Sequence, residues 1–184
     1  MKVKVNKVTI QIVQGEILSL SVNALVHATD PNLHLDPVLR LKAGVKVEQE
    51  CADIGWCDIG NAVITSGGQL SVDKVIHVVG PRWGEGSERG KLANATLACL
   101  HRAEENRLKS IAMPAISAGI LGYPLENCAR TMLNQIIDFT FEPPKYLRTV
   151  TLCLDTSPAY EIFRHELHQQ VEDLRATGEG EVTA

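Results

Sequence analysis

The sequence predicts an α/β protein in which helices cover both faces of a central sheet, giving a three-layer α/β/α sandwich. Short apolar segments alternate with longer segments of helical periodicity. Several of the apolar segments lack polar alternation, so they suit a mixed, largely parallel sheet that is buried on both faces. The chain has 184 residues, of which 45% are hydrophobic and 22% charged. That length supports one domain core and hardly a second.

The elements follow from the periodicity of the sequence. Residues 2–13 alternate polar and apolar side chains, the pattern of one strand or a pair of short strands. Further strands are expected at 23–28, 61–65, 74–79, 110–113 and 149–154. Helices are expected at 37–51, where Gly44 weakens the pattern, at 91–106, at 125–141, and from Ser157, the predicted N-cap, onward. We expect a single domain over 1–174 and a disordered tail over 175–184.

Composition narrows the function classes. The formal charge is −4, and no broad basic field is present, so non-specific nucleic-acid binding is disfavoured. A modest basic cluster comprises Arg82, Arg89, Lys91, Arg102, Arg107 and Lys109. The five cysteines form no C-x-x-C pair, which argues against a disulfide scaffold or a zinc finger, and Cys99 and Cys153 suit buried positions. Without a signal-peptide pattern or a long apolar run, we expect a cytoplasmic protein with no membrane partner.

The most informative segment is residues 110–130. A short apolar run leads into the small-residue loop 117–122, and Tyr123 and Pro124 then precede an amphipathic helix. Glycine lets the backbone approach a ligand closely, and a helix N-terminus offers unpaired N–H groups and the positive end of the helix dipole. Pro124 suits the first helical position. This segment therefore predicts a site for a phosphate-bearing ligand.

Three blocks, in order, resemble the macro domain family over residues 8 to about 167. The first is Val13–Ile17 followed by Val22–Val26, the second is Gly60–Thr65 followed by Val75–Trp83, and the third, the most specific, runs from Pro114 to Leu125. The resemblance implies a three-layer fold with a cleft for ADP-ribose at the C-terminal edge of the sheet. An open α/β sheet places its ligand at that edge on general grounds as well.

The resemblance also implies roles for particular residues. Glu16 stands where the family usually has an Asp that accepts a hydrogen bond from the adenine amino group. Backbone N–H groups at Ser117, Gly119, Ile120 and Gly122 would bind the diphosphate. Leu121 stands where many members have an aromatic residue near the ribose, and Leu154 where one often packs on adenine. The implied ligand-binding set is Glu16, Ile17, His27, Asp30, Ser117, Ala118, Gly119, Ile120, Leu121, Gly122, Tyr123 and Leu154.

The chain departs from the family pattern at the distal-ribose end. Active members typically carry Asn-Ala-Ala-Asn and then a run of glycines ending in an Asp that orients water. Here residues 27–30 read His-Ala-Thr-Asp, the glycine run is absent, and Arg40 takes the place of the Asp. Pro37 and Val38 cannot let the backbone approach the distal ribose as glycine does. The segment 31–39 could therefore either close over the cleft or fill it.

The rebuilt segment contains two imidazoles and two carboxylates, at His27, Asp30, His34 and Asp36. Such a set can act in general acid/base catalysis or bind a divalent metal, so Asp30, His34 and Asp36 are catalytic candidates. The alternative is a polar loop that lines the cleft, and His27 also suits a hydrogen-bonded core position, as does His77. The spacing matches no metal motif, and we assign no metal and no cofactor.

Three functions remain in competition. The leading one is a binding module for ADP-ribose or a related nucleotide, free or protein-linked, with weak or no catalysis. The second is a hydrolase of ADP-ribosylated protein, O-acetyl-ADP-ribose or ADP-ribose-1″-phosphate. The third is a fold retained as a structural or protein-interaction module. The oligomeric state is left open.

Overall fold

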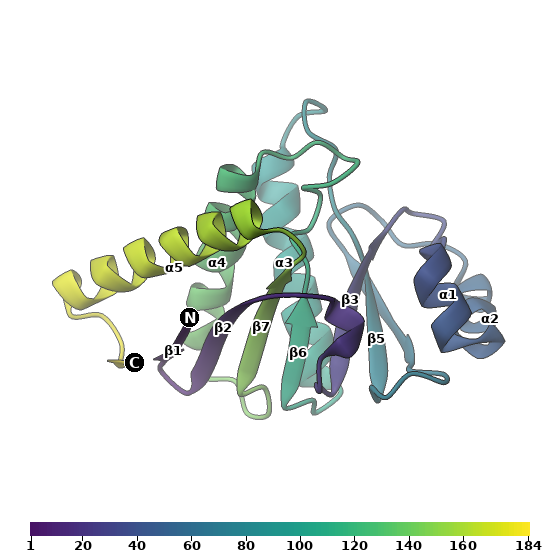
Figure 1. The fold of residues 1–184 in the computed structure, drawn as a ribbon, viewed down its shortest axis with the longest axis horizontal. Helices are drawn as coiled ribbons and strands as arrows, with labels where there is room; N and C mark the ends of the chain where they lie inside the picture. Colours follow the sequence, from purple (N-terminus) through teal and green to yellow (C-terminus); the bar gives the residue numbers. More distant parts are fainter.

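A computed structural model describes residues 1–184 and has the predicted three-layer α/β/α architecture around an eight-stranded sheet (Figure 1). The elements in chain order are β1 (Lys2–Val5), β2 (Val8–Gln14), the short 3-10 helix η1 (Ile17–Ser19), β3 (Ala24–Thr29), α1 (Pro37–Ala43), α2 (Val45–Ile54), β4 (Ala62–Ser66), β5 (Lys74–Val79), α3 (Glu88–Glu105), β6 (Ser110–Met113), α4 (Leu125–Thr140), β7 (Thr149–Leu154), α5 (Ser157–Thr177) and β8 (Val182–Thr183). None of these helices combines the length and the apolarity needed to cross a bilayer.

The sheet is mixed, as predicted, with its parallel strands in the middle. The strand order is β4-β5-β3-β6-β7-β2-β1-β8. The pairings from β5 through β3, β6 and β7 to β2 are parallel, whereas β4 and β1–β8 add antiparallel edges. The C-terminal ends of the parallel strands therefore lie together at one edge of the sheet, where an α/β fold places its ligand.

Two hydrophobic clusters lie on opposite faces of the sheet. The larger one joins α3, α4 and α5 to the sheet, and Val26 contributes to it from β3. The smaller one joins α1 and α2 to the other face, and the adjacent residue Leu25 contributes to that. Successive residues of one strand thus serve both cores, which explains why the central strands read as continuous apolar runs.

The structure differs from the sequence expectations at several element ends. The helix expected from residue 91 begins at Glu88, and Pro124 is the N-cap residue of α4 rather than its first helical residue. The helix expected at 37–51 is divided into α1 and α2 at Gly44, whose positive φ of 83° ends one helix before the next begins. The last helix is capped by Thr156 rather than Ser157, because the Thr156 side chain accepts a hydrogen bond from the Ala159 N–H. The tail expected to be disordered from residue 175 instead continues α5 to Thr177 and adds β8 to β1 through Val5↔Val182.

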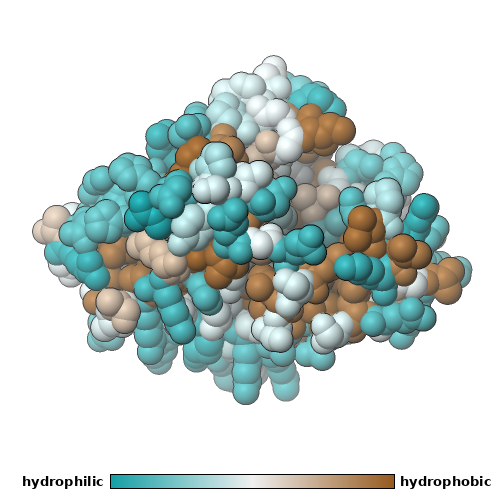
Figure 2. All heavy atoms as spheres, in the orientation of Figure 1, coloured by the Kyte–Doolittle hydropathy of each residue, from teal (hydrophilic) through white to brown (hydrophobic).

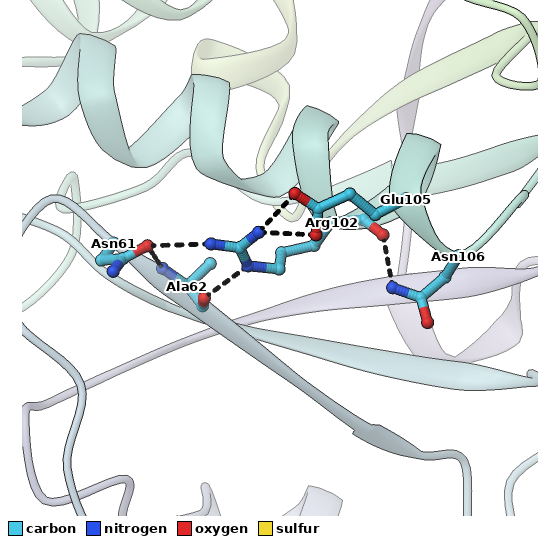
Figure 3. Close-up of polar contacts among 5 residues, drawn as sticks. All are labelled: Asn61, Ala62, Arg102, Glu105 and Asn106. Carbon is cyan, nitrogen blue, oxygen red and sulfur yellow. Dashed lines mark hydrogen bonds and ion pairs between the residues drawn. The ribbon is translucent and has the colours of Figure 1, made fainter.

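One member of the basic cluster has a structural role. Figure 3 shows Arg102 of α3 reaching the start of β4, where its Nε donates to the Ala62 carbonyl at 3.0 Å. Its guanidinium also pairs with Glu105 at 2.7 Å. Arg102 thus fixes the edge of the sheet to the helix layer.

Candidate functional site

Two cavities lie at the C-terminal ends of the parallel strands, on either side of the segment that follows β6. We call them the β3–β5 cavity, of about 590 Å³, and the β2–β7 cavity, of about 700 Å³. Both have Asp36 in their walls, so they are adjacent, and we refer to the two together as the cleft. In Figure 2 the surface is hollowed between the loops at the top and the α1 side at the right, where apolar side chains gather over α1 and α2. Each cavity is of a size that holds a small organic ligand.

The two cavities differ in chemistry. The β2–β7 cavity has apolar walls that include Ile17 and Leu154, with the carboxylates of Glu16 and Asp155 at its edge. An aromatic base with an exocyclic amino group suits such walls, because the carboxylates supply acceptors. The β3–β5 cavity has fewer hydrophobic residues in its wall and is lined by Asp30, His34, Asp36, Arg82, Glu85 and Ser117. That lining suits a group rich in hydroxyls.

Free backbone donors belong to residues that line the β3–β5 cavity. The N–H groups of Ser117, Gly119, Ile120 and Leu121 donate to no protein acceptor. The expected donor Gly122 is not one of them, since its N–H donates to the Gly119 carbonyl at 3.0 Å. The loop ends at α4, whose N-terminus has no side-chain cap. Successive free N–H groups beside a helix N-terminus form a concave anion site.

Ser117 combines two energetically unfavourable features. Its φ is +67°, a left-handed conformation that L residues rarely adopt. Its side chain is buried, and its Oγ is the one buried side-chain polar atom that makes no hydrogen bond within the protein. Backbone strain and an unpaired hydroxyl each cost of order 1–3 kcal/mol, and such costs concentrate at ligand sites.

The segment 31–39 neither fills the cleft nor remains an open loop. Leu33 and Leu39 are buried in the smaller hydrophobic cluster, and α1 begins at Pro37. The Asp36 carboxylate caps α1 by accepting from the Val38 and Leu39 N–H groups at 3.0 and 3.2 Å. Arg40 lines neither cavity and lies instead in a shallow groove with Glu48. The segment thus leads into a helix start, and the space of the cleft remains.

His27 and His77 form a buried hydrogen-bonded pair behind the β3–β5 cavity. The Asp36 N–H donates to His27 Nε2 at 3.2 Å, and the two Nδ1 atoms lie 3.2 Å apart. His77 Nε2 lies 2.8 Å from Thr65 Oγ1. One assignment of the imidazole protons satisfies this series of hydrogen bonds. His27 donates from Nδ1 to His77, and His77 donates from Nε2 to Thr65. Both imidazoles are therefore neutral.

Burial explains why these histidines stay neutral. It lowers the pKa of His27 to about 4, although the Asp36 and Asp30 carboxylates act in the opposite direction. Burial, together with the neighbouring His27, lowers the pKa of His77 to about 3. The core position considered for His27 and His77 is thus the one found. His27 also forms part of the cavity wall, but both of its ring nitrogens are occupied.

Asp30 and His34 form a second pair, at the surface of the β3–β5 cavity. His34 Nδ1 lies 2.9 Å from Asp30 Oδ2, and the other carboxylate oxygen accepts from the Asn32 N–H at 2.9 Å. Partial desolvation raises the pKa of Asp30, but the hydrogen bonds from His34 and Asn32 outweigh it and hold that pKa below its usual value. Asp30 is therefore ionised at neutral pH.

Most of the residues that the sequence indicated lie in the walls of the cleft. His27, Asp30, Ser117, Gly119, Ile120 and Leu121 line the β3–β5 cavity, and Glu16, Ile17, Ala118 and Leu154 line the β2–β7 cavity. Gly122 and Tyr123 line neither, and the buried Tyr123 ring packs against Trp83 at 4.9 Å between centroids. Arg82, Glu85 and Lys42 also line the cleft, although they are not among the site residues that the resemblance implies. The Gly-Pro-Arg-Trp segment after β5 was the available signal for Arg82.

Comparison with known proteins agrees with this geometry. The macro domain family profile matches residues 22–132. An uncharacterised protein of Saccharolobus solfataricus is 38% identical over 84% of this chain and 90% of its own length. An O-acetyl-ADP-ribose deacetylase of Salmonella gallinarum is 37% identical over 89% of this chain and 97% of its own. The Oceanobacillus iheyensis macrodomain with ADP has a TM-score of 0.88 at 30% identity, covering 94% of this chain and 97% of that one.

Proposed function

Because the chain belongs to the macro domain family, we propose that its cleft binds ADP-ribose. The observation that carries the proposal is the set of free N–H groups at Ser117, Gly119, Ile120 and Leu121, beside the N-terminus of α4. These donors bind the diphosphate, the one strongly anionic part of the ligand. The related macrodomain of Oceanobacillus iheyensis with ADP supports a nucleotide as the ligand.

The chemistry of the two cavities sets the direction of the ligand. The adenine enters the β2–β7 cavity, where Glu16 accepts from its amino group and Leu154 packs on its ring. The distal ribose enters the β3–β5 cavity, where Arg82 and Glu85 offer partners to its hydroxyl groups. The diphosphate crosses between the cavities near Asp36.

Calorimetric titration with ADP-ribose, ADP and AMP tests this function. We expect a dissociation constant near the micromolar range for ADP-ribose, about −8 kcal/mol, and weaker binding of ADP and AMP. ADP-ribose should bind more tightly than ADP, because ADP has no distal ribose to enter the β3–β5 cavity. If the folded protein gives neither heat of binding nor a thermal shift with any of these three nucleotides, binding is refuted. The remaining hypothesis is then a fold kept as a structural or protein-interaction module.

Replacement of Gly119 by valine should weaken ADP-ribose binding at least about tenfold without unfolding the protein. A Cβ at this position meets no atom within 4 Å, so the fold has room for it. The added side chain stands in the cleft, however, because Gly119 lines the β3–β5 cavity. Affinity is measured by calorimetry, and tenfold corresponds to about 1.4 kcal/mol.

The matched control is Gly90→Val, because Gly90 has equally open surroundings and lies in α3 outside the cleft. It should leave the affinity for ADP-ribose unchanged. Unaltered binding by a folded Gly119→Val protein would contradict the placement of the diphosphate on this loop.

Hydrolysis of an ADP-ribose derivative is a second candidate function. The observations on whether this chain has catalytic activity point in opposite directions. The absence of a glycine run in the segment 31–39 argues for weak or no catalysis. The similarity to a Salmonella O-acetyl-ADP-ribose deacetylase over 97% of that protein's length, and the Asp30–His34 pair in the cavity wall, favour turnover. Release of acetate from O-acetyl-ADP-ribose decides between them.

A further inference from the structure

The segment that replaces the glycine run holds an imidazole and a carboxylate in a fixed geometry. The Asp30 carboxylate accepts from the His34 ring at 2.9 Å and from the Asn32 N–H at 2.9 Å. The segment itself is held by the Leu33 N–H, which donates to the Asp30 carbonyl at 2.9 Å, and by the Thr29 hydroxyl, which donates to the His34 carbonyl. Leu33, buried and at a φ of +61°, anchors the turn in the core. The pair is thus preorganised by packing.

The contact with Asp30 determines which nitrogen of His34 can react. Nδ1 carries a proton and donates it to the carboxylate, so Nε2 is the free acceptor. A carboxylate that fixes the tautomer and the orientation of an imidazole is the arrangement that prepares histidine to take up and return a proton. His34 is largely exposed and lines the cavity, so Nε2 is accessible to water and ligand.

The other basic groups of the cavity wall each have a partner within the protein. His27 uses both ring nitrogens inside the protein, and the Asp36 carboxylate caps α1. Glu85 pairs with Arg82 at 3.5 Å. His34 is therefore the one imidazole of this cavity that has a free acceptor nitrogen.

A donor for a developing negative charge lines the same cavity. The buried Ser117 hydroxyl has no partner within the protein, and it is separate from the backbone N–H groups that bind the diphosphate. A hydrogen-bond donor that is fixed before the reaction stabilises the oxyanion formed when water attacks an ester. The cavity therefore combines a base with an oxyanion donor.

We propose that His34, oriented by Asp30, is the general base and acid in hydrolysis of an acyl ester carried on the distal ribose of ADP-ribose. The assignment rests on the proposed function, which places that ribose in the β3–β5 cavity. His34 Nε2 takes a proton from water as the water oxygen bonds to the acyl carbon. The bond from that carbon to the ribose oxygen then breaks, and His34 returns the proton to the departing oxygen. The products are a carboxylic acid and ADP-ribose.

The test uses purified protein with O-acetyl-ADP-ribose, following acetate release, and measures ADP-ribose affinity in parallel by calorimetry. His34→Gln should lower kcat by about 100-fold or more, the usual contribution of general acid/base catalysis, while KM and the ADP-ribose affinity change less than about threefold. Asp30→Asn, which alters a positioning residue, should also lower kcat and spare KM. The matched control is His101→Gln, because His101 forms a similar pair with Glu142 at 3.5 Å outside the cleft. It should leave kcat unchanged.

Three results would overturn the assignment. Wild-type protein that binds ADP-ribose but releases no acetate refutes the catalytic role alone and leaves the proposed function standing. A His34→Gln protein with wild-type kcat also refutes it, and weaker binding in that variant would make His34 a binding residue instead. Failure of wild-type protein to bind ADP-ribose refutes the proposed function and the catalytic role together.

Discussion

Replacement of Gly80 by alanine is expected to destabilise the protein and to lower ADP-ribose affinity by more than about tenfold. Gly80 follows β5, and Ser117 lies directly over it. A Cβ at residue 80 would stand 2.1 Å from Ser117 Oγ and 2.6 Å from Ile116 Cγ2. Ile116 is fully buried and cannot move outward without disturbing the core. The strain must therefore displace the loop that supplies the free N–H groups.

The magnitude of this effect follows from the cost of overpacking, about 1–3 kcal/mol for extra methyl groups in a packed interior. In a chain of this length, each kcal/mol lowers Tm by about 2–4 °C. Thermal unfolding and calorimetry of Gly80→Ala measure the two consequences separately. Gly119→Ala is the control for the thermal unfolding alone, because it adds the same methyl group to the same cleft where no atom lies within 4 Å.

A second substitution locates the source of the strain. Adding Ser117→Gly to Gly80→Ala removes the hydroxyl that the new methyl group meets, and glycine also accepts the φ of +67° at residue 117 without cost. The double variant should therefore recover part of the lost Tm, in a non-additive way. Equal destabilisation of the single and double variants would show that contact with Ser117 is not the cause.

The sequence predicted the elements better than their assembly. Strands such as 74–79 and 110–113 are short apolar runs, a local signal that survives in the fold. The strand order and the addition of β8 to β1 depend on pairings between distant segments. Val182 and Thr183 carry no strong strand pattern of their own, and they are ordered by the free edge that β1 offers.

The candidate site was predicted where its signal is local. Glycines within 117–122 indicated a phosphate loop, but the donor at Leu121 and the bonded N–H of Gly122 depend on how that loop turns. The contact between Gly80 and Ser117 joins residues that the sequence leaves unrelated. His27 likewise meets His77 only because β3 and β5 pair in a parallel register that sets these two residues side by side.

This histidine pair should make the protein lose stability as the pH falls from about 6.5 to 4. Both folded-state pKa values lie below the ordinary value of 6.5, at about 4 for His27 and about 3 for His77. Between those values and 6.5 the unfolded chain binds protons that the folded chain does not, so acid favours unfolding. One pKa unit corresponds to 1.36 kcal/mol, which gives about 3 kcal/mol for each histidine by pH 4.

Urea unfolding at a series of pH values measures this dependence. The histidines dominate the slope in the upper part of this range, because Asp and Glu, with ordinary pKa values of about 3.9 and 4.3, stay largely ionised above about pH 5.3. His27→Gln/His77→Gln should remove most of the slope between pH 6.5 and 4.5, although the double variant starts from a lower stability at pH 7. His101→Gln, at an exposed position, should keep the wild-type slope.

A wild-type protein whose free energy of unfolding is the same at pH 7 and pH 4.5 would mean that the pair accepts a proton in the folded state. The hydrogen-bond chain from the Asp36 N–H to Thr65 could then not be the neutral one, since a protonated His27 cannot accept from Asp36.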